Sequence, residues 1–556
     1  RVEAGGRIDA DAGGYGSSSG PGWMPGANNN ESSDRGGSHG GRQGADRWAL
    51  QSLPPARIYG SAEAPAAPGS GSYSYSGGGA IRLEVAGALA IDGVVTADSG
   101  GSRPAGSGGS VYITCETIRG AGLVSASAGR YAYPATGSFG DSGVSGKAGG
   151  GGGRIAVHYD PAAQNACDCT ILFEARGTPV ATGTARSNLG GGLGTVWFTD
   201  ARFVTSPLRH SGILCVPGFT EWRPAELRID GWAGFPPGFT LDVGGGLVCT
   251  NTDAAGAGLE LDASTLAVGG DALVRGAGIR LFNGASMQIA GNLVQETARD
   301  ASGICRTYHA GEVWCHPAPT NAAAADGVGA RIEIGGAWLM ATNTYTRLMC
   351  EYTNGAVVRV ACRHLLMDAG AVIDADRMGW RHGYGPGTPS SGIYGASHGG
   401  HGGTFKNYVP RPIYGDEQQP RYPGSGSHAV PWEGGGVIWI EASRRMKLDG
   451  VLAASATKPR AYWCSGAAGG TVYLSCGRLE ESAGAIRATG SSGAEYGRPG
   501  GGGRIAIWSV SGSTNGLAIT VACGANPYPS SGESLAEDGT VYFGRLPATG
   551  LIILLQ

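Results

Sequence analysis

The stretch from Gly434 to Val510 decides the fold. It opens with GGGVIWIEA, continues through LDG at Leu448, GGTVYLSC at Gly469 and GAIRATG at Gly484, and closes with GGGGRIAIWSV. Between Gly77 and Asp160 the same pieces return in the same order, as GGGAIRLEV, IDG, GGSVYITC, GLVSASAG and GGGGGRIAVHYD. Each piece joins a glycine run to a short alternation of apolar and polar residues, which is the pattern of a β-strand. An internal repeat of this kind indicates a repetitive architecture.

The repeat extends on both sides of this stretch. IDAD at Ile8 recurs at Ile373, SHGG at Ser38 recurs at Ser397, and IYG recurs at Ile58 and Ile413. PGSGS at Pro68 returns at Pro423, and GTVWF at Gly194 is matched by GTVYF at Gly539. We therefore divide the chain into a first glycine-rich module (1–200), a segment with short loops (201–365) and a second glycine-rich module (366–556).

The middle segment shows the underlying unit most clearly. Leu259 and Leu261 recur as Ile279 and Leu281, and other apolar pairs return at spacings of roughly 20 to 26 residues. One coil of two or three short strands cannot bury its apolar face alone, whereas stacked coils can. The sequence therefore predicts an all-β fold, a parallel β-helix or β-solenoid with long ordered glycine-rich loops; the alternative is an antiparallel sandwich. The residues expected in one continuous core are Leu261, Val268, Leu281, Ile289, Ile332, Ile334, Val358 and Val360. Leu273 is aligned with Leu293.

Composition restricts the possible partners. The chain has 556 residues, of which 104 are glycine, and its net charge is -3. Glycine at about a fifth of the residues is far above the usual share of about 7%. The charge provides no basic field for nucleic acid, and the apolar LIILLQ at the C-terminus is too short to span a bilayer. We expect no nucleic acid partner and no membrane insertion.

Acidic pairs recur at matching positions of the two modules. Asp9 and Asp11 in the first copy match Asp374 and Asp376 in the second. Carboxylates at i and i+2 on a strand point the same way, so a Ca²⁺ site is one hypothesis. A polysaccharide-cleaving carboxylate set is another, and turn capping at a solenoid corner is the structural alternative, which we favour. No cofactor is expected unless these residues hold Ca²⁺.

Two further polar residues recur in glycine-rich surroundings. His39 matches His398, and we expect each ring to bind a loop carbonyl rather than a metal. Arg154 matches Arg504, and we expect each guanidinium to fork onto backbone carbonyls or a carboxylate.

The chain has 12 cysteines, an even number. None forms a zinc-type CxxC pair, so disulfides in an oxidising compartment are the preferred interpretation. Cys305 and Cys315 flank RTYHAGEVW, which we interpret as a hairpin-like excursion closed by a disulfide. Cys464 and Cys476 are a second candidate pair.

These motifs resemble those of a known group of proteins. SHGGxxG, PGSGS and GGGGRIAV, present here at Ser38, Pro68 and Gly150 and again at Ser397, Pro423 and Gly500, resemble a family of very large secreted glycine-rich repeat proteins of bacterial cell surfaces. The two modules cover about two thirds of the chain. The resemblance implies a β-solenoid architecture and a secreted, extracellular or cell-surface location, and it implies no reaction.

We therefore expect a structural protein rather than an enzyme. The favoured function is that of a subunit in a self-assembling fibre, sheath or surface layer, a homopolymer built by head-to-tail stacking. The C-terminal strand Leu551, Ile552, Ile553, Leu554 and Leu555 is the expected contact with the first coil of the next subunit. The alternative is a carbohydrate-binding adhesin or a polysaccharide-degrading enzyme on a parallel β-helix, with surface glycans as partners.

Overall fold

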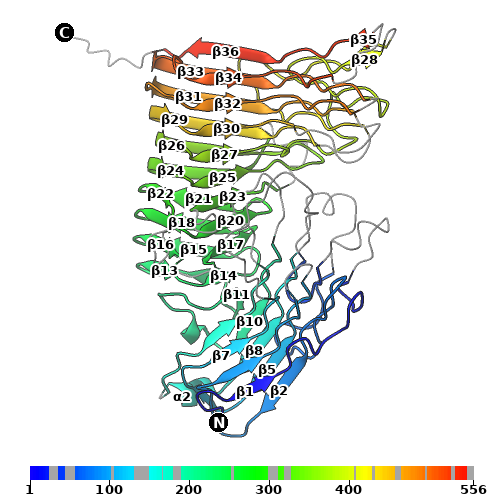
Figure 1. Cartoon of the computed structure of the whole chain (residues 1–556). Coiled ribbons are helices and arrows are strands. Elements are labelled where there is room, and N and C mark those ends of the chain that lie inside the picture. Colours follow the sequence, from blue (N-terminus) through cyan, green and yellow to red (C-terminus); the bar gives the residue numbers. More distant parts are fainter. Residues whose placement is uncertain are drawn as a thin grey trace, which may run out of the picture.

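A computed structural model shows how the strands are arranged. The structure describes residues 1–23, 36–43, 57–101, 105–129, 149–165, 167–178, 190–251, 256–298, 311–318, 327–405, 408–428, 433–456, 465–494, 497–526 and 533–547. These residues form a stack of β-coils with the N-terminus at one end and the C-terminal strands at the other (Figure 1). Every strand pairing but one is parallel, so the predicted parallel β-solenoid is confirmed.

The first long sheet has 14 strands and runs almost the full length of the stack. In spatial order these strands are β2 (Ala80–Glu84), β5 (Ser110–Thr114), β8 (Arg154–His158), β10 (Thr195–Phe198), β11 (Gly212–Cys215), β14 (Trp232–Gly234), β17 (Gly258–Asp262), β20 (Gly278–Phe282), β23 (Glu312–Cys315), β25 (Tyr345–Leu348), β27 (Val372–Asp374), β30 (Val451–Ala453), β32 (Ala485–Arg487) and β34 (Ala518–Thr520).

The second long sheet also has 14 strands and begins only after the first module. Its main path is β12 (Glu221–Trp222), β15 (Thr240–Val243), β18 (Thr265–Val268), β21 (Ser286–Ile289), β24 (Val328–Met340), β26 (Val357–Met367), β29 (Val437–Leu448), β31 (Thr471–Leu479), β33 (Arg504–Gly512) and β36 (Thr540–Arg545). A branch joins β24 from β13 (Leu227–Ile229), β16 (Leu247–Thr250), β19 (Ala272–Arg275) and β22 (Leu293–Glu296).

Short elements complete the coils. A four-stranded sheet in the first module contains β1 (Arg7–Asp9), β4 (Val94–Thr96), β7 (Leu123–Ser125) and β9 (Leu172–Glu174). Two pairs, β3 (Ala88–Ala90) with β6 (Thr117–Arg119) and β28 (Thr404–Phe405) with β35 (Glu533–Ser534), lie apart, the latter antiparallel. The described helices are the single turns α2 (Pro161–Gln164) and η2 (Ala201–Phe203). Among the described residues, no helix is long and apolar enough to cross a membrane.

Strand register places the predicted core residues in one ladder. Leu259 lies opposite Ile279, and Leu261 opposite Leu281, as the repeat predicts. All eight predicted core residues are at most 3% exposed and belong to one apolar cluster that runs through the stack. One alignment was wrong: Leu293 pairs with Ala272, and Leu273 pairs with Val294. The alternation along β19 turns Leu273 outward, so a one-residue slip reverses which face it occupies.

The two modules have equivalent strands at equivalent registers. Arg154 lies between Ser110 and Thr195, just as Arg504 lies between Thr471 and Thr540. However, the strands that follow the glycine runs (β2, β5, β8, β10) belong to the first long sheet in copy 1, whereas their equivalents (β29, β31, β33, β36) belong to the second long sheet in copy 2. The copies therefore share one continuous solenoid, but each strand of copy 2 lies on a different face of the solenoid from its equivalent in copy 1.

The glycine runs form a layer of extended chains beside the strands. Gly151, Gly152 and Gly153 donate in turn to carbonyls of three different segments, those of Gly37, Gly192 and Ala126. A β-strand has only two lateral neighbours, so this pattern requires a backbone with about three residues per turn, as in polyproline II. In copy 2, Gly501, Gly502 and Gly503 repeat it with Ala396, Glu537 and Ala488. A Cβ on Gly152 would lie 2.1 Å from the Ala175 carbonyl oxygen, so side chains are excluded there.

The cysteine prediction is not supported. Cys315 and Cys476 carry free thiols and are buried. Cys315 ends β23, where it pairs with Leu281 and Leu348 in the core ladder, so Glu312–Cys315 is a solenoid strand and not part of a hairpin-like excursion. The predicted partners Cys305 and Cys464 lie outside the described residues.

Candidate functional site

A short segment crosses the outside of the sheet in each module. We call residues 58–68 and 413–423 the straps. Arg154 Nε donates to the Tyr59 carbonyl at 2.9 Å, and Arg154 Nη1 donates to Thr195 Oγ1 at 3.0 Å. Arg504 makes the same two bonds to Tyr414 and Thr540, at 3.0 and 2.9 Å. Each arginine binds a backbone carbonyl as predicted, but the second arm of its fork binds a threonine hydroxyl instead of a further carbonyl or a carboxylate. Each guanidinium thus fixes its strap to two neighbouring strands.

Further contacts fasten each strap along its length. Ser110 Oγ donates to the Ala67 carbonyl at 2.6 Å, and Thr471 Oγ1 donates to the Tyr422 carbonyl at 2.7 Å. His158 Nε2 binds the Glu63 carbonyl at 2.7 Å. At the equivalent position of copy 2 a different residue, Trp508, donates from Nε1 to the Gln418 carbonyl at 2.6 Å. A histidine and a tryptophan thus make equivalent bonds to the strap backbone, so the shared role of these two positions is to hold the strap in place.

A buried histidine lies beneath each strap. His39 Nδ1 is 2.9 Å from the Gly108 carbonyl oxygen, and His398 Nδ1 is 2.7 Å from that of Gly469. A carbonyl only accepts, so Nδ1 carries the proton in both rings. The predicted bond to a loop carbonyl is thus confirmed. Each ring also packs against the tyrosine of its strap, with centroids 4.6 Å apart for Tyr59 and 4.7 Å apart for Tyr414.

Burial keeps both histidines neutral. Desolvation, together with the nearby Arg154 guanidinium, lowers the pKa of His39 to about 4. The same causes, with Arg504 as the neighbour, lower the pKa of His398 to about 3. Nε2 of both rings is buried and has no hydrogen-bond partner in the part of the chain that the structure describes. A metal would need further ligands, and the described residues contain no group of three or more His, Cys, Asp or Glu side chains able to hold one.

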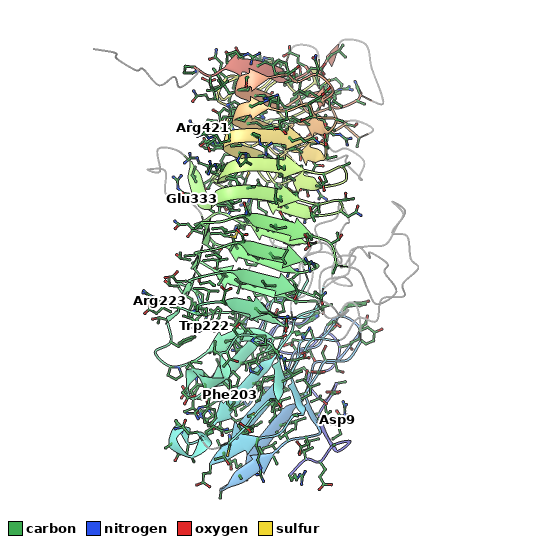
Figure 2. All side chains as sticks on the ribbon, turned by 90° about the vertical axis from the view of Figure 1, so that its left-hand side faces the viewer. Asp9, Phe203, Trp222, Arg223, Glu333 and Arg421 are labelled. Carbon is green, nitrogen blue, oxygen red and sulfur yellow. The ribbon has the colours of Figure 1, made fainter. Side chains whose placement is uncertain are left out.

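The recurring aspartates make turn and ion-pair contacts. Asp9 accepts from Arg7 Nε at 2.7 Å and from the Asp11 backbone N–H at 2.7 Å, and Arg7 Nη2 also binds Asp11. Asp11 Oδ1 accepts the backbone N–H of Asp98 in the next coil at 2.7 Å. These bonds occupy the oxygens that Ca²⁺ would use, and they agree with the capping interpretation. Asp9 lies near the N-terminal end of the stack, on the opposite side from Arg421 (Figure 2).

The second aspartate pair makes similar contacts. Asp374 pairs with Arg347 at 3.1 Å, binds the Tyr345 hydroxyl, and accepts the Asp376 backbone N–H at 2.9 Å. Asp376 accepts the Ser455 N–H at 2.5 Å. Burial and the neighbouring Asp374 raise the pKa of Asp376 to about 7. The contacts of both pairs are bonds within the chain, so they give the calcium hypothesis no support.

Sequence reasoning missed a polar row on the outside of the first long sheet. Glu260, Arg280, Trp314, Arg347 and Asp374 occupy the same position on five successive strands. The Arg280 and Arg347 guanidiniums each lie 5.0 Å from the Trp314 ring centroid, within cation–π range. Arg280 also lies 4.2 Å from the Trp232 ring. The sequence could have revealed this row in two steps. The inward apolar residues align the strands, and the outward residues at one position of the aligned strands are then mostly charged.

Two members of this row, and Glu312, which precedes Trp314 by two residues on β23, have unusual surroundings. Glu312, beside Trp314, is 3% exposed, and desolvation raises its pKa to about 7 although Arg280 and Arg347 act in the opposite direction. Trp314 Nε1 and Arg280 Nε are buried, and neither has a hydrogen-bond partner among the described residues. A buried acid near neutral pKa beside unsatisfied donors is a feature of binding and catalytic sites as well as of structural networks.

Comparison of the chain with family models, with curated proteins and with solved structures gives no match. The resemblance to glycine-rich repeat proteins therefore stays a prediction that rests on the motifs.

Proposed function

We propose that this chain is an extracellular structural protein, a subunit of a self-assembling fibre, sheath or surface layer whose copies stack head to tail. The strap contacts carry this proposal. The polar side chains that recur in both modules make matching internal bonds, from Arg154 and Arg504 to the strap carbonyls and from His39 and His398 to the glycine layer. Polar residues that recur in both modules and bond within the chain hold its segments together, and they do not point toward a substrate.

The location and partners follow from the same proposal. Dense backbone hydrogen bonding in the glycine layer suits a protein exposed to conditions outside the cell, and the motif resemblance supports a cell-surface location. Its main partner is a second copy of itself. Surface glycans are a further partner class. The C-terminal Leu551 to Leu555, the contact expected from the sequence, lies outside the described residues.

Sedimentation velocity over a hundredfold range of concentration, with electron microscopy of the same samples, tests the proposal. We expect the sedimentation coefficient to rise with concentration and elongated assemblies to appear. A single monomer species at every concentration would contradict self-assembly.

The polar row supports a second candidate function, carbohydrate binding. Trp314 and Glu312 are each only 3% exposed, so this function requires the segments over them to open. Sugar hydroxyls both donate and accept, so a sugar admitted in this way would bind the Trp314 Nε1 donor and the Glu312 carboxyl at once. Affinity electrophoresis in gels that contain soluble polysaccharides would detect this. Retardation that is lost in Trp314→Phe, which keeps the ring but removes the donor, and retained in Trp508→Phe would favour this function.

A further inference from the structure

The C-terminal coil exposes a rung of the core ladder. Val541 and Phe543 on β36 lie opposite Ile505 and Ile507, which are buried. In the interior of the stack a further strand would cover such residues, but Val541 is 40% exposed and Phe543 55% exposed. β34 and β36 are also the last strands of their sheets among the described residues, so both edges have unpaired backbone groups.

The N-terminal coil has the form of an interior coil. β1 and β4 pair at the register of β27 and β30, with Ile8 opposite Val95 as Ile373 lies opposite Leu452. In copy 2 another coil covers this position, because β25 pairs with β27. In copy 1, β1 and β2 are the first strands of their sheets. Ile8 and Leu83 are only partly buried against the core.

We propose that the β34–β36 face of one copy docks on the β1–β2 face of a second copy. This deepens the proposed function by naming the interface and its register. In the interior, Val437, Thr471, Arg504 and Thr540 share one position on successive strands, as do Ala80, Ser110, Arg154 and Thr195. Continuing this ladder places Thr540 opposite Ala80 of the second copy, Val541 opposite Ile81, and Phe543 opposite Leu83.

Side chains outside the core fit the same register. Tyr542 falls opposite Arg82 of the second copy, whose guanidinium already lies 4.6 Å from the Tyr112 ring of its own chain. Docking would place this cation between two aromatic rings. At the equivalent interior position Arg359 lies 5.8 Å from the Trp439 ring, so a cation–aromatic pair across this coil boundary is part of the established stacking.

A second copy is the occupant that these observations favour. The exposed strand β36 is the fourth of the strands β29, β31, β33 and β36, and the receiving strand β2 is the first of the equivalent strands β2, β5, β8 and β10. Within each set, successive strands already pair in parallel. A contact between two different faces is heterologous, and it generates an open filament when the rotation does not close.

The test uses a variant in which the β34–β36 face is disrupted and the β1–β2 face is unchanged. Phe543→Asp places a charge in the proposed interface, at a side chain that is already half exposed in the single chain, so the fold should survive. Its matched control is Ile58→Asp, at an apolar side chain that is 51% exposed, next to Tyr59, whose carbonyl binds Arg154 on β8, a strand with neighbours on both sides. We expect Phe543→Asp alone to raise the concentration needed for assembly by at least about tenfold, because an unpaired buried charge costs more than a tenfold change in affinity, whereas Ile58→Asp leaves it unchanged.

Mixing experiments test the polarity. A Phe543→Asp copy retains its β1–β2 face, so added in small amounts to the unmodified chain it should dock at one end and shorten the filaments. Cysteines test the register: copies carrying Thr540→Cys and Ala80→Cys should form an intermolecular disulfide, since Cα atoms of paired strands lie at bridging distance. The offset pair Tyr542→Cys and Ala80→Cys should not.

The outcomes separate this inference from the proposed function. Filaments that are insensitive to Phe543→Asp, or cross-linking by the offset pair instead of the aligned one, would overturn the interface while leaving self-assembly intact. Failure of the unmodified chain to assemble at any concentration would overturn both.

Discussion

His39 and His398, the buried histidines beneath the straps, should make the protein lose stability in acid. Their pKa values in the folded state are lower than the ordinary 6.5, at about 4 for His39 and about 3 for His398. The folded state therefore binds fewer protons than the unfolded state. The stabilisation is fully present above pH 6.5 and is lost as the pH falls from 6.5 toward 4.

The size of the effect follows from the shift. Between pH 7.5 and pH 5 each histidine should cost about 2 kcal/mol, because the unfolded imidazole is almost fully protonated at pH 5 while the folded one is still mostly neutral. The two together should cost about 4 kcal/mol if the modules unfold as one unit. If the coils unfold separately, each module should show about half of this effect.

The perturbation that isolates this effect is His39→Asn combined with His398→Asn. The asparagine amide can still donate to the Gly108 or Gly469 carbonyl, but it does not titrate. The double variant should be less stable than the original chain at pH 7.5, since it loses the packing on Tyr59 and Tyr414, yet it should lose about 4 kcal/mol less on going to pH 5.

Urea unfolding followed by circular dichroism at a series of pH values measures this difference. Burial also lowers the pKa of His210 to about 4, and Glu312 and Asp376 titrate in the opposite sense. All three are present in both proteins, so their contributions cancel in the comparison. Equal acid losses in the original and the double variant would refute the assignment, as would an NMR titration in which either imidazole becomes charged above pH 6.

Three further predictions concern the glycine layer, the core and the polar row. Gly14→Ala should destabilise the first module by about 1–3 kcal/mol or more, because the added Cβ would lie 2.3 Å from the Gly78 carbonyl oxygen. Gly16→Ala should cost under about 0.5 kcal/mol, because its Cβ would meet only Ser19 Oγ, at 4.0 Å. Thermal unfolding compares the two variants, and equal losses of stability would argue against close packing in the glycine layer. Leu281→Asp should unfold the coils next to β20, seen as lost amide protection in hydrogen exchange, because Leu281 is fully buried; protection unchanged in β17 and β23 would count against one shared core. Burial raises the pKa of Glu312 from 4.5 to about 7 in the folded chain, so ionisation costs the original chain stability as the pH rises from 5 to 8. Glu312→Gln should remove this loss, so urea unfolding should show the variant gaining stability relative to the original chain at pH 8 but not at pH 5. The same pH profile in both proteins would show that Glu312 titrates normally.

The sequence predicts the coils well because their evidence is periodic. Apolar alternation identifies which residues of a strand face inward, and the spacing of Leu259 and Ile279 identifies which strands are neighbours. The same reasoning applied to loop landmarks places His39 and Arg154 at recurring internal contacts. It cannot tell on which face of the coil a strand lies, because that depends on how many strands each turn contains. Thus it finds two equal modules but not the change of sheet between β10 and β29.

Other features depend on residues distant in sequence. The polar row of Glu260, Arg280 and Trp314 emerges only after the strands are stacked in register, since each of these residues alone is an ordinary outward side chain. The disulfide prediction failed at Cys315 for a related reason. The flanking sequence suggests an excursion, whereas all four residues of Glu312–Cys315 are buried, and Val313 and Cys315 belong to the core cluster. Small, buried cysteines fit such a ladder as apolar residues.

Cryo-electron microscopy of the unmodified chain at high concentration tests the central claim of a head-to-tail structural polymer most directly. The account predicts filaments in which parallel strands continue across each subunit boundary at the spacing of about 4.8 Å found within a sheet, with β36 of one copy beside β2 of the next. Isolated particles, or copies joined side by side through their straps, would contradict it.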